Sequence, residues 1–369
     1  QTLKQWQITI IMLFTMTFQL FLVFSGFFRK RTAHPLFHSL IWISFIGLDA
    51  LSAYAIGLML AGGCDHVFSL WAPILLFHLG ASDSINAYSP SDNELWQRHS
   101  LKMTLEIIGA AYILSRSGNC TKFLGTASLI FIIGAFKYLE RVHALWCGSA
   151  NQVVRCSRSV YRFMALDHGH GSEMDENHIH RLVVSGEASW YKQNKFRPNF
   201  NAENTSLVTY EDVVQCRELR RAARYINDVC LAFALFKIYR RRLTNLRIHH
   251  KDEDYEKVKR VFFPRGRGEP SPLRIMKVID MELSFIFDGT FTKGAAGGWF
   301  QGIGIATRGL SILLLFVCAV DLLAGDVAKI ACEGGSDGST STPNVRFAGA
   351  MTILLVIVSF GVECLQAYK

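Results

Sequence analysis

Residues 8–28 read ITIIMLFTMTFQLFLVFSGFF, an apolar stretch of 21 residues without a charged side chain. An α-helix rises about 1.5 Å per residue, and about 20 apolar residues are needed to cross the hydrocarbon core of a bilayer. The stretch is too long for the apolar region of a signal peptide, and it lacks a small-residue cleavage site. It therefore predicts a spanning helix in an integral membrane protein.

Six further apolar blocks follow along the chain, and each is a candidate span. Composition agrees, because 50% of the residues are hydrophobic and only 19% are charged, fewer than the roughly 25% of an ordinary soluble domain. The third block is short and predicts either a short crossing or a re-entrant hairpin. The seven blocks are Ile8–Phe28, Leu40–Ala61, Val67–Leu79, His99–Ser115, Phe123–Trp146, Gly302–Leu323 and Val345–Leu365.

The charges between the blocks orient the chain. Arg29, Lys30 and Arg31 follow the first block, and residues 148–300 hold 25 Lys and Arg against 18 Asp and Glu. An excess of Lys and Arg marks the cytosolic side of a membrane protein. Both regions fall on that side only if Val67–Leu79 crosses, so seven spans are favoured over the re-entrant hairpin.

The predicted fold is an all-α integral membrane protein with about seven transmembrane helices and a helical cytosolic insertion. Residues 1–147 form an N-terminal transmembrane bundle of about five spans, residues 148–300 the basic insertion, and residues 301–369 a C-terminal transmembrane pair. Residues 165–205 lack periodicity and are rich in Gly, Asn, His and charge, which predicts a mobile loop.

Two helices are predicted in the remainder of the insertion. Thr209 is a suitable N-cap with Asp212 as its capping-box partner, and a long helix over Tyr210–Leu246 should follow. A second helix should start at Pro272, because proline suits the first helical turn. Its apolar residues are spaced for one buried face: Leu273, Met276, Ile279, Leu283 and Phe287.

Three of the nine cysteines fall in non-cytosolic loops of the seven-span topology, namely Cys64, Cys120 and Cys332. Disulfides persist in such compartments. A lumenal disulfide among these three and three free thiols both stay open, because spacing alone cannot fix cysteine pairing.

Four histidines lie within 13 residues of the predicted loop, namely His168, His170, His178 and His180. Neighbouring carboxylates would complete a zinc site of the usual ligand types. The alternative is a solvated loop, because no cysteine pair supports the site.

Residues 78–99 carry Asp83, Asp92 and Glu94 beside the predicted membrane boundary. Clustered carboxylates at a pore mouth concentrate cations. The alternative is helix capping, in which Ser91 or Asp92 starts the next helix.

Two carboxylates, Asp49 and Glu106, lie inside apolar blocks. A carboxylate at mid-bilayer costs about 2.5–3.5 kcal/mol on insertion scales, so it usually faces a partner or a water-filled cavity. Both are candidates for an ion pathway together with the acidic stretch. Lys137, Glu140 and Arg141 share one helix face by their spacing, so they predict a buried charge network and are candidate partners for the two carboxylates.

Signatures of enzymes are missing from the sequence. It has no phosphate-binding loop, dinucleotide fingerprint, metalloprotease helix or nucleophile elbow, and no cofactor is expected. The basic tracts lack a nucleic-acid recognition fold, so no nucleic-acid partner is expected.

Several stretches resemble a plant membrane-protein family called "domain of unknown function 4220". The likeness covers nearly all of the chain, although Ala81-Ser82 and Asn86 depart from the family's usual Gly-Gln and Thr. Members often carry a further C-terminal domain, so the chain is expected to continue beyond Lys369. The resemblance implies a plant protein and supplies no activity. The matching stretches are WAPILLFHLG at 71–80, DNELWQRH at 92–99, KYLER at 137–141, LAFALFKIYRRR at 231–242 and ELSFIFDGTFTK at 282–293.

These observations favour a homo-oligomeric, cation-permeable membrane channel or pore in the endoplasmic reticulum or plasma membrane. The alternative is a membrane scaffold or receptor-like signalling protein that recruits cytosolic proteins through its inserted helices. Both readings place the chain in the lipid bilayer.

Overall fold

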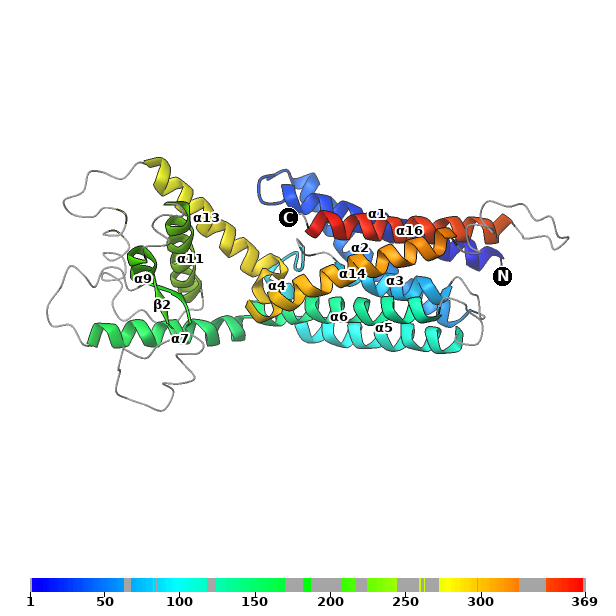
Figure 1. Ribbon diagram of the computed structural model, residues 1–369, viewed down its shortest axis with the longest axis horizontal. Helices are drawn as coiled ribbons and strands as arrows, with labels where there is room; N and C mark the ends of the chain where they lie inside the picture. Colours follow the sequence, from blue (N-terminus) through cyan, green and yellow to red (C-terminus); the bar gives the residue numbers. More distant parts are fainter. Residues whose placement is uncertain are drawn as a thin grey trace. The chain divides into compact units, whose positions relative to one another are not determined.

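The chain divides into two units (Figure 1): a bundle unit, Gln1–Cys147 with Thr290–Lys369, and an inserted unit, Gly148–Gly289. Residues 290–300, expected to close the insertion, belong to the bundle unit. The structure is a computed structural model that describes residues 2–62, 68–81, 83, 85–117, 124–169, 182–186, 207–216, 224–243, 259, 262, 272–296, 298–324 and 343–367.

The described part of the bundle unit is helical, which confirms the predicted all-α character of this unit. Each predicted apolar block corresponds to one long helix, and a short α4 and a 3-10 turn η3 precede two of them. The elements are α1 (Thr2–Phe28), α2 (Pro35–Leu60), α3 (Phe68–Ala81), α4 (Pro90–Glu94), α5 (Trp96–Ser117), α6 (Leu124–Gly148), η3 (Lys293–Ala296), α14 (Gly298–Ala324) and α16 (Pro343–Ala367).

Three stretches of helix are long and apolar enough to cross a bilayer, namely Trp6–Gly26, Pro35–Leu60 and Ala350–Ala367. Two shorter apolar stretches, Leu70–Gly80 and Gly304–Val320, fall below that length. The membrane character of the bundle unit is thereby supported, whereas seven crossings stay a prediction.

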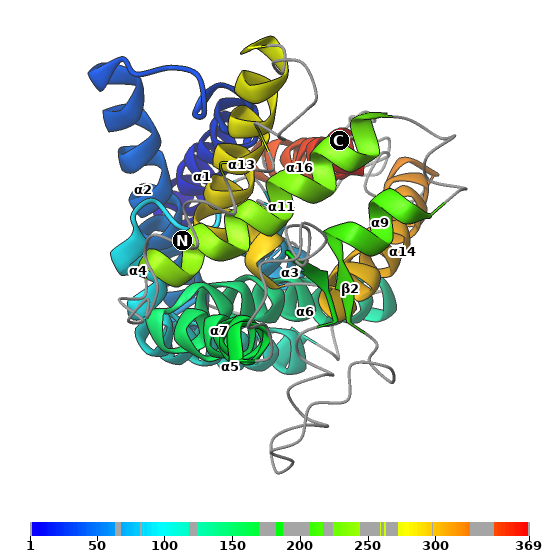
Figure 2. The same ribbon diagram turned by 90° about the vertical axis from the view of Figure 1, so that its left-hand side faces the viewer.

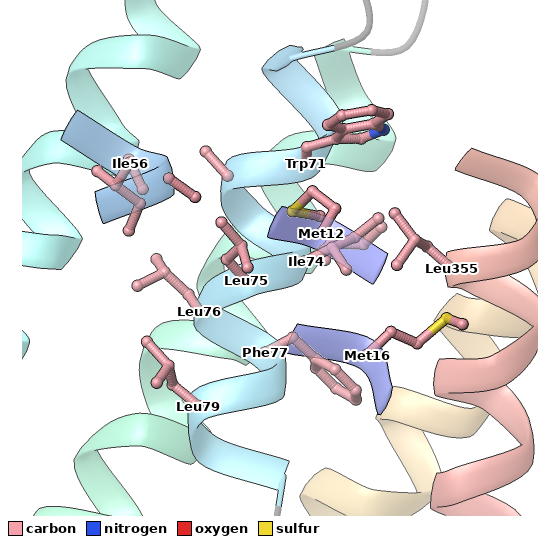
Figure 3. Close-up of a cluster of buried hydrophobic side chains, with 14 of the residues drawn as sticks. Met12, Met16, Ile56, Trp71, Ile74, Leu75, Leu76, Phe77, Leu79 and Leu355 are labelled. Carbon is pink, nitrogen blue, oxygen red and sulfur yellow. The ribbon is translucent and has the colours of Figure 1, made fainter. Parts of the chain in front are cut away.

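Helix α3 is central to the core of the bundle unit. Residues 70–80 are buried without interruption, and α2, α5 and α16 all contact this helix. Figure 3 shows Met12 and Met16 of α1, Ile56 of α2 and Leu355 of α16 around it. A short helix that is apolar on every side fits an internal position, which explains why α3 differs from its longer neighbours.

The inserted unit is smaller and contains the only strands in the described residues. Strands β1 (Val183–Ser185) and β2 (Val208–Thr209) pair antiparallel, and α11 contacts α7, α9 and β1 (Figure 2). The helices of this unit are α7 (Ala150–Gly169), α9 (Tyr210–Gln215), α11 (Arg224–Leu243) and α13 (Pro272–Phe291), whose last two residues belong to the bundle unit.

Some local predictions for the insertion are confirmed. Thr209 caps α9, and its hydroxyl accepts a hydrogen bond from the amide of Asp212. Helix α13 begins at Pro272 as expected. The single helix over Tyr210–Leu246 is wrong, because α9 ends at Gln215 and α11 starts at Arg224. The N-cap at Thr209 and the apolar stretch Val229–Phe236 therefore belong to two different helices, α9 and α11.

The predicted loop 165–205 lies mostly outside the described residues. Within it, α7 continues to Gly169, and β1 occupies Val183–Ser185. Both segments are regular structure and not loop. Strand β1 pairs with β2, which is distant in the sequence, and local periodicity could not reveal this pairing.

The buried face of α13 differs from the predicted one. Val278 is fully buried, and Met281 and Phe285 pack beside it against the core of the inserted unit. Of the five positions expected to be buried, Phe287 is half-buried. The other four are exposed: Leu273, Met276, Ile279 and Leu283. Helix α13 is therefore apolar on two opposite faces. The prediction from spacing alone was wrong about which of these faces is buried.

Candidate functional site

A first group of charges joins α2, α5 and α6 inside the bundle unit. The guanidinium of Arg141 donates to Asp49 Oδ1 at 3.0 Å, and Lys102 Nζ lies 3.3 Å from Asp49 Oδ2. Glu106 accepts a 2.7 Å hydrogen bond from the hydroxyl of Tyr138, and Lys102 lies 3.7 Å from its other oxygen. We call these five residues the α2–α5–α6 cluster; it contains two carboxylates and two cations.

A second group lies where the chain re-enters the bundle unit after the insertion, and we call it the junction cluster. Lys293 Nζ lies 2.9 Å from Asp83 Oδ1 and 3.3 Å from Glu140 Oε2. The same ammonium donates to the carbonyl of Gly80 at 2.6 Å. Arg308 of α14 pairs with Asp83 Oδ2 at 2.5 Å. Two carboxylates and two cations again balance one another.

The environment of the junction cluster shifts two pKa values in opposite directions. Burial alone would raise the pKa of Asp83, but Lys293 and Arg308 hold it below its ordinary value. Burial alone would lower the pKa of Lys293, but Asp83 and Glu140 hold it above its ordinary value. Each partner therefore keeps the other in its charged form.

A file of polar side chains follows one face of α16, and we call it the α16 polar file: Thr352, Ser359, Glu363 and Gln366. Trp71 Nε1 of α3 donates to Thr352 Oγ1 at 2.8 Å. One heptad further along both helices, His78 Nε2 lies 2.8 Å from Ser359 Oγ. Because both partners advance by seven residues, α3 and α16 run parallel and in register.

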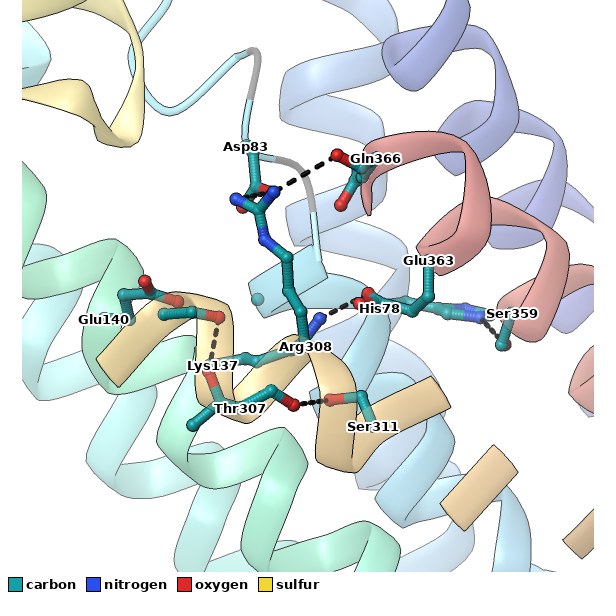
Figure 4. Close-up of polar contacts among 12 residues, drawn as sticks. His78, Asp83, Lys137, Glu140, Thr307, Arg308, Ser311, Ser359, Glu363 and Gln366 are labelled. Atoms are coloured by element: carbon teal, nitrogen blue, oxygen red, sulfur yellow. Dashed lines mark hydrogen bonds and ion pairs between the residues drawn. The ribbon is translucent and has the colours of Figure 1, made fainter. Parts of the chain in front are cut away.

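The α16 polar file then meets charged groups from α6 and α14 (Figure 4). Lys137 of α6 forms an ion pair with Glu363 Oε1, and both side chains are almost fully buried. Arg308 donates to the backbone carbonyl of Gln366 at 3.2 Å. The file thus leads from the middle of α16 to the junction cluster.

The hydrogen bonds around Ser359 assign the tautomer of His78. The hydroxyl of Ser359 donates to the carbonyl of Leu355 at 2.7 Å, so its oxygen is left to accept from the imidazole. His78 therefore carries its proton on Nε2, and Nδ1 keeps an unprotonated lone pair.

Several buried polar atoms of the α16 polar file and of His78 beside it have no hydrogen-bond partner among the described residues. These atoms are His78 Nδ1, Glu363 Oε2 and both side-chain amide atoms of Gln366. Buried polar groups nearly always have partners, which include ordered water. The arrangement therefore provides hydrogen-bonding capacity for water or another small species inside the bundle unit.

Two glycines bring Lys137 close to the file. A Cβ on Gly80 of α3 would lie 2.5 Å from the amide nitrogen of Tyr138. A Cβ on Gly134 of α6 would lie 2.8 Å from the amide nitrogen of Phe77. Small residues allow helix backbones to approach closely in membrane proteins, so α3 and α6 touch where the polar groups gather.

The acidic stretch contributes a cap and an exposed carboxylate. Asp92 Oδ2 accepts from the amides of Tyr88 and Ser89 at 2.9 Å, so Asp92 helps to start α4, although Ser89 is the N-cap and not Ser91 or Asp92. Glu94 is exposed on α4. Asp83 is separate from both, because it belongs to the junction cluster.

The predicted charge network is divided between clusters. Arg141 contacts Asp49, Glu140 contacts Lys293, and Lys137 contacts Glu363. One face of α6 therefore forms ion pairs with residues of three different segments. Glu363, Lys293 and Arg308 were not foreseen, although Glu363 could have been found as a lone carboxylate in the last apolar block.

Other predicted sites lie outside the described residues. This holds for Cys64, Cys120 and Cys332, and for His170, His178 and His180; His168 is described only as part of the α7 backbone. The part of the chain that the structure describes contains no group of three or more metal-ligating side chains.

A family model described as "Domain of unknown function (DUF4220)" matches residues 42–369. Neither the curated proteins nor the solved structures yield a match.

Proposed function

The chain belongs to the DUF4220 family, and we propose that this member is a cation-permeable membrane channel whose conducting route follows the α16 polar file. The proposal is carried by buried polar atoms on His78, Glu363 and Gln366 that have no hydrogen-bond partner among the described residues. These three residues are at most 5% exposed. Ionisable side chains inside a membrane protein commonly mark ion or proton pathways.

In the proposed topology all seven long helices cross the membrane, α3 as a short crossing. Helices α3 and α16 would then run in the same direction, and the parallel hydrogen bonds from Trp71 and His78 support this. The junction cluster lies at the cytosolic end of the bundle in this topology.

The length of the file also supports the proposal. Thr352 and Gln366 are fourteen residues apart, which corresponds to about 21 Å along a helix. A hydrocarbon core is about 30 Å thick. The described file would therefore line the greater part of one route.

Asp49 is not the leading carboxylate of this proposed route. Its two cationic neighbours, Arg141 and Lys102, account for its burial as a structural partner. Glu363 replaces it as the leading carboxylate, because one of its oxygens lacks a partner among the described residues.

The proposal is tested by cation flux into liposomes that contain the purified full chain. Glu363→Gln alone leaves Lys137 buried without its partner, so the test variant is Lys137→Gln/Glu363→Gln, which keeps the pair neutral. Flux should be lost in this variant. The control is Glu211→Gln in α9 of the inserted unit, which removes one carboxylate outside the bundle and should conduct normally. Absence of cation flux through folded wild type would refute the channel.

A second candidate function is a membrane scaffold or receptor-like protein. It is favoured by the outer face of α13, where Leu273, Met276 and Leu283 are 63%, 70% and 58% exposed. Contiguous exposed apolar residues often mark protein interaction sites. Loss of a co-purifying cytosolic partner in Met276→Ser/Leu283→Ser, with no flux in wild type, would favour this function.

Homo-oligomerisation and residence in the endoplasmic reticulum or plasma membrane belong to the same proposal. The α16 polar file lies within one chain, so the proposed route does not depend on an assembly. Mass measurement of the protein in detergent or nanodiscs tests the oligomer separately from flux.

A further inference from the structure

We propose that the cation conducted along the α16 polar file is the proton, relayed by His78 and Glu363. This inference rests on the proposed channel function and names the species that the route carries. Three features of the described residues support it: balanced charge, tight burial and the orientation of the imidazole.

The charge inside the bundle unit does not favour a metal cation. Among the described residues of the bundle unit, these ion pairs join five carboxylates to five cations. Selectivity filters for metal cations use rings of uncompensated carboxylates or carbonyls. The carboxylates here are Asp49, Asp83, Glu106, Glu140 and Glu363, and the cations are Lys102, Lys137, Arg141, Lys293 and Arg308.

The space around the file is equally restrictive. His78, Ser359 and Glu363 are 2%, 1% and 0% exposed. A hydrated metal ion needs an open passage, whereas a proton needs only titratable groups and single water molecules that link them. Chains of Asp, Glu and His serve as proton relays in pumps and transporters.

The tautomer of His78 supplies a buried base. Its Nε2 proton is committed to Ser359 Oγ, because the hydroxyl of Ser359 donates to Leu355. Its Nδ1 lone pair has no donor among the described residues. Ser359 and Glu363 are one helical turn apart on α16, so Glu363 lies on the same helix face as the hydroxyl that contacts the imidazole.

The relay moves one proton without electron transfer. A proton that binds at His78 Nδ1 converts the neutral ring to imidazolium. When it passes to Glu363 Oε2, directly or through one water molecule, the ring is neutral again and the carboxylate becomes a carboxylic acid. Release of the proton toward Gln366 restores the carboxylate.

The charged groups that face this relay come from several elements. Lys137 of α6 pairs with Glu363, Arg308 of α14 reaches the carbonyl of Gln366, and Asp83 and Lys293 adjoin Arg308. Helix α1 also contacts α16, and its described buried polar side chains, Thr9, Thr15, Gln19 and Ser25, are uncharged.

The test compares proton and metal-cation flux in the same proteoliposomes. Purified full chain is reconstituted with an internal pH dye, and a potassium diffusion potential set with valinomycin drives protons inward. Wild type should acidify the lumen, whereas sodium uptake under the same potential should stay at the level of empty liposomes.

Two variants locate the relay. His78→Gln keeps a side-chain N–H for Ser359 but cannot be protonated, and Lys137→Gln/Glu363→Gln removes the carboxylate and its partner together. Both should lose proton flux, and each must first show a folded, monodisperse bundle. Glu211→Gln should conduct protons as wild type does.

The outcomes separate the two proposals. Sodium flux without proton flux overturns the proton relay and leaves the channel standing. Absence of flux for every cation overturns the channel itself. Unchanged proton flux in folded His78→Gln overturns the role of His78.

Discussion

At the scale of single residues, Gly80 gives the sharpest stability prediction. Its α-hydrogen faces the backbone of Lys137 and Tyr138, where a Cβ would lie 2.5 Å from the nearest atom. Overpacking of this kind costs about 1–3 kcal/mol. Gly80→Ala should therefore lower the melting temperature in detergent. Gly125→Ala on α6 is the control, because nothing lies within 4 Å of its added Cβ. Equal melting temperatures for the two variants would contradict the close contact of α3 and α6.

A second prediction at this scale concerns pH. The pKa of Asp83 is lowered, so its contribution to stability is complete above the ordinary value of 3.8 and is lost as pH falls through the folded pKa. The pKa of Lys293 is raised, so its contribution is complete below 10.5 and is lost as pH rises through the folded pKa. Lys293→Met should remove the alkaline part of this dependence.

The measurement is the melting temperature as a function of pH in wild type, Lys293→Met and the control Lys277→Met. Lys277 is exposed on α13, so its replacement should leave the alkaline slope unchanged. If the melting temperature of Lys293→Met fell at high pH as steeply as that of wild type, the junction cluster would not be the cause of the loss of stability at high pH.

Single residues also show how far sequence reasoning reaches. Asp49 and Glu106 could be identified because a carboxylate is rare in an apolar block. Spacing along one helix face identified three more charged residues, namely Lys137, Glu140 and Arg141. Their partners could not be foreseen, since Lys137 meets Glu363 across 226 residues and Lys293 meets Gly80 across 213. Such pairings depend on which helices become neighbours.

At the scale of elements, the parallel contact of α3 with α16 can be tested through Thr352. Thr352→Val keeps the shape of the side chain but removes the hydroxyl that accepts from the indole N–H of Trp71. Loss of a hydrogen bond typically costs about 0.5–1.5 kcal/mol, so the melting temperature should fall. Thr104→Val on α5 is the control, because its hydroxyl is exposed and bonds only within its own helix.

A fall of equal size in both variants would mean that the Trp71–Thr352 bond adds nothing beyond the loss of a threonine. Emission of Trp71, measured against a Trp71→Phe background, should shift only in Thr352→Val if the indole changes its surroundings.

The elements themselves were partly predictable. Caps and proline marked the starts of α9 and α13, because these signals act within one helical turn. The buried face of α13 could not be predicted, since Leu273 and Val278 are both apolar and only tertiary packing determines which of them is buried. The end of α9 was also missed: Cys216 is the C-cap in an extended conformation, and no glycine or proline marks this position in the sequence.

At the scale of the whole molecule, the seven-span topology predicts that the inserted unit lies in the cytosol. An epitope placed near residue 200 should be cleaved when intact microsomes are treated with protease. A second epitope near residue 335, between α14 and α16, should be protected. Protection of the first epitope would contradict the topology and would support a re-entrant α3.

The parallel bonds between α3 and α16 also have a consequence for synthesis. Trp71 and His78 meet partners 281 residues further along the chain. In the proposed seven-span topology, α3 enters the bilayer during translation long before Thr352 and Ser359 have left the ribosome. The nascent bundle must shelter an indole and an imidazole in lipid, with an insertion chaperone or with temporary water, until the last helix arrives. A premature stop before α16 would leave these groups exposed to quality control, and such a product should be degraded rapidly even though every earlier helix is intact.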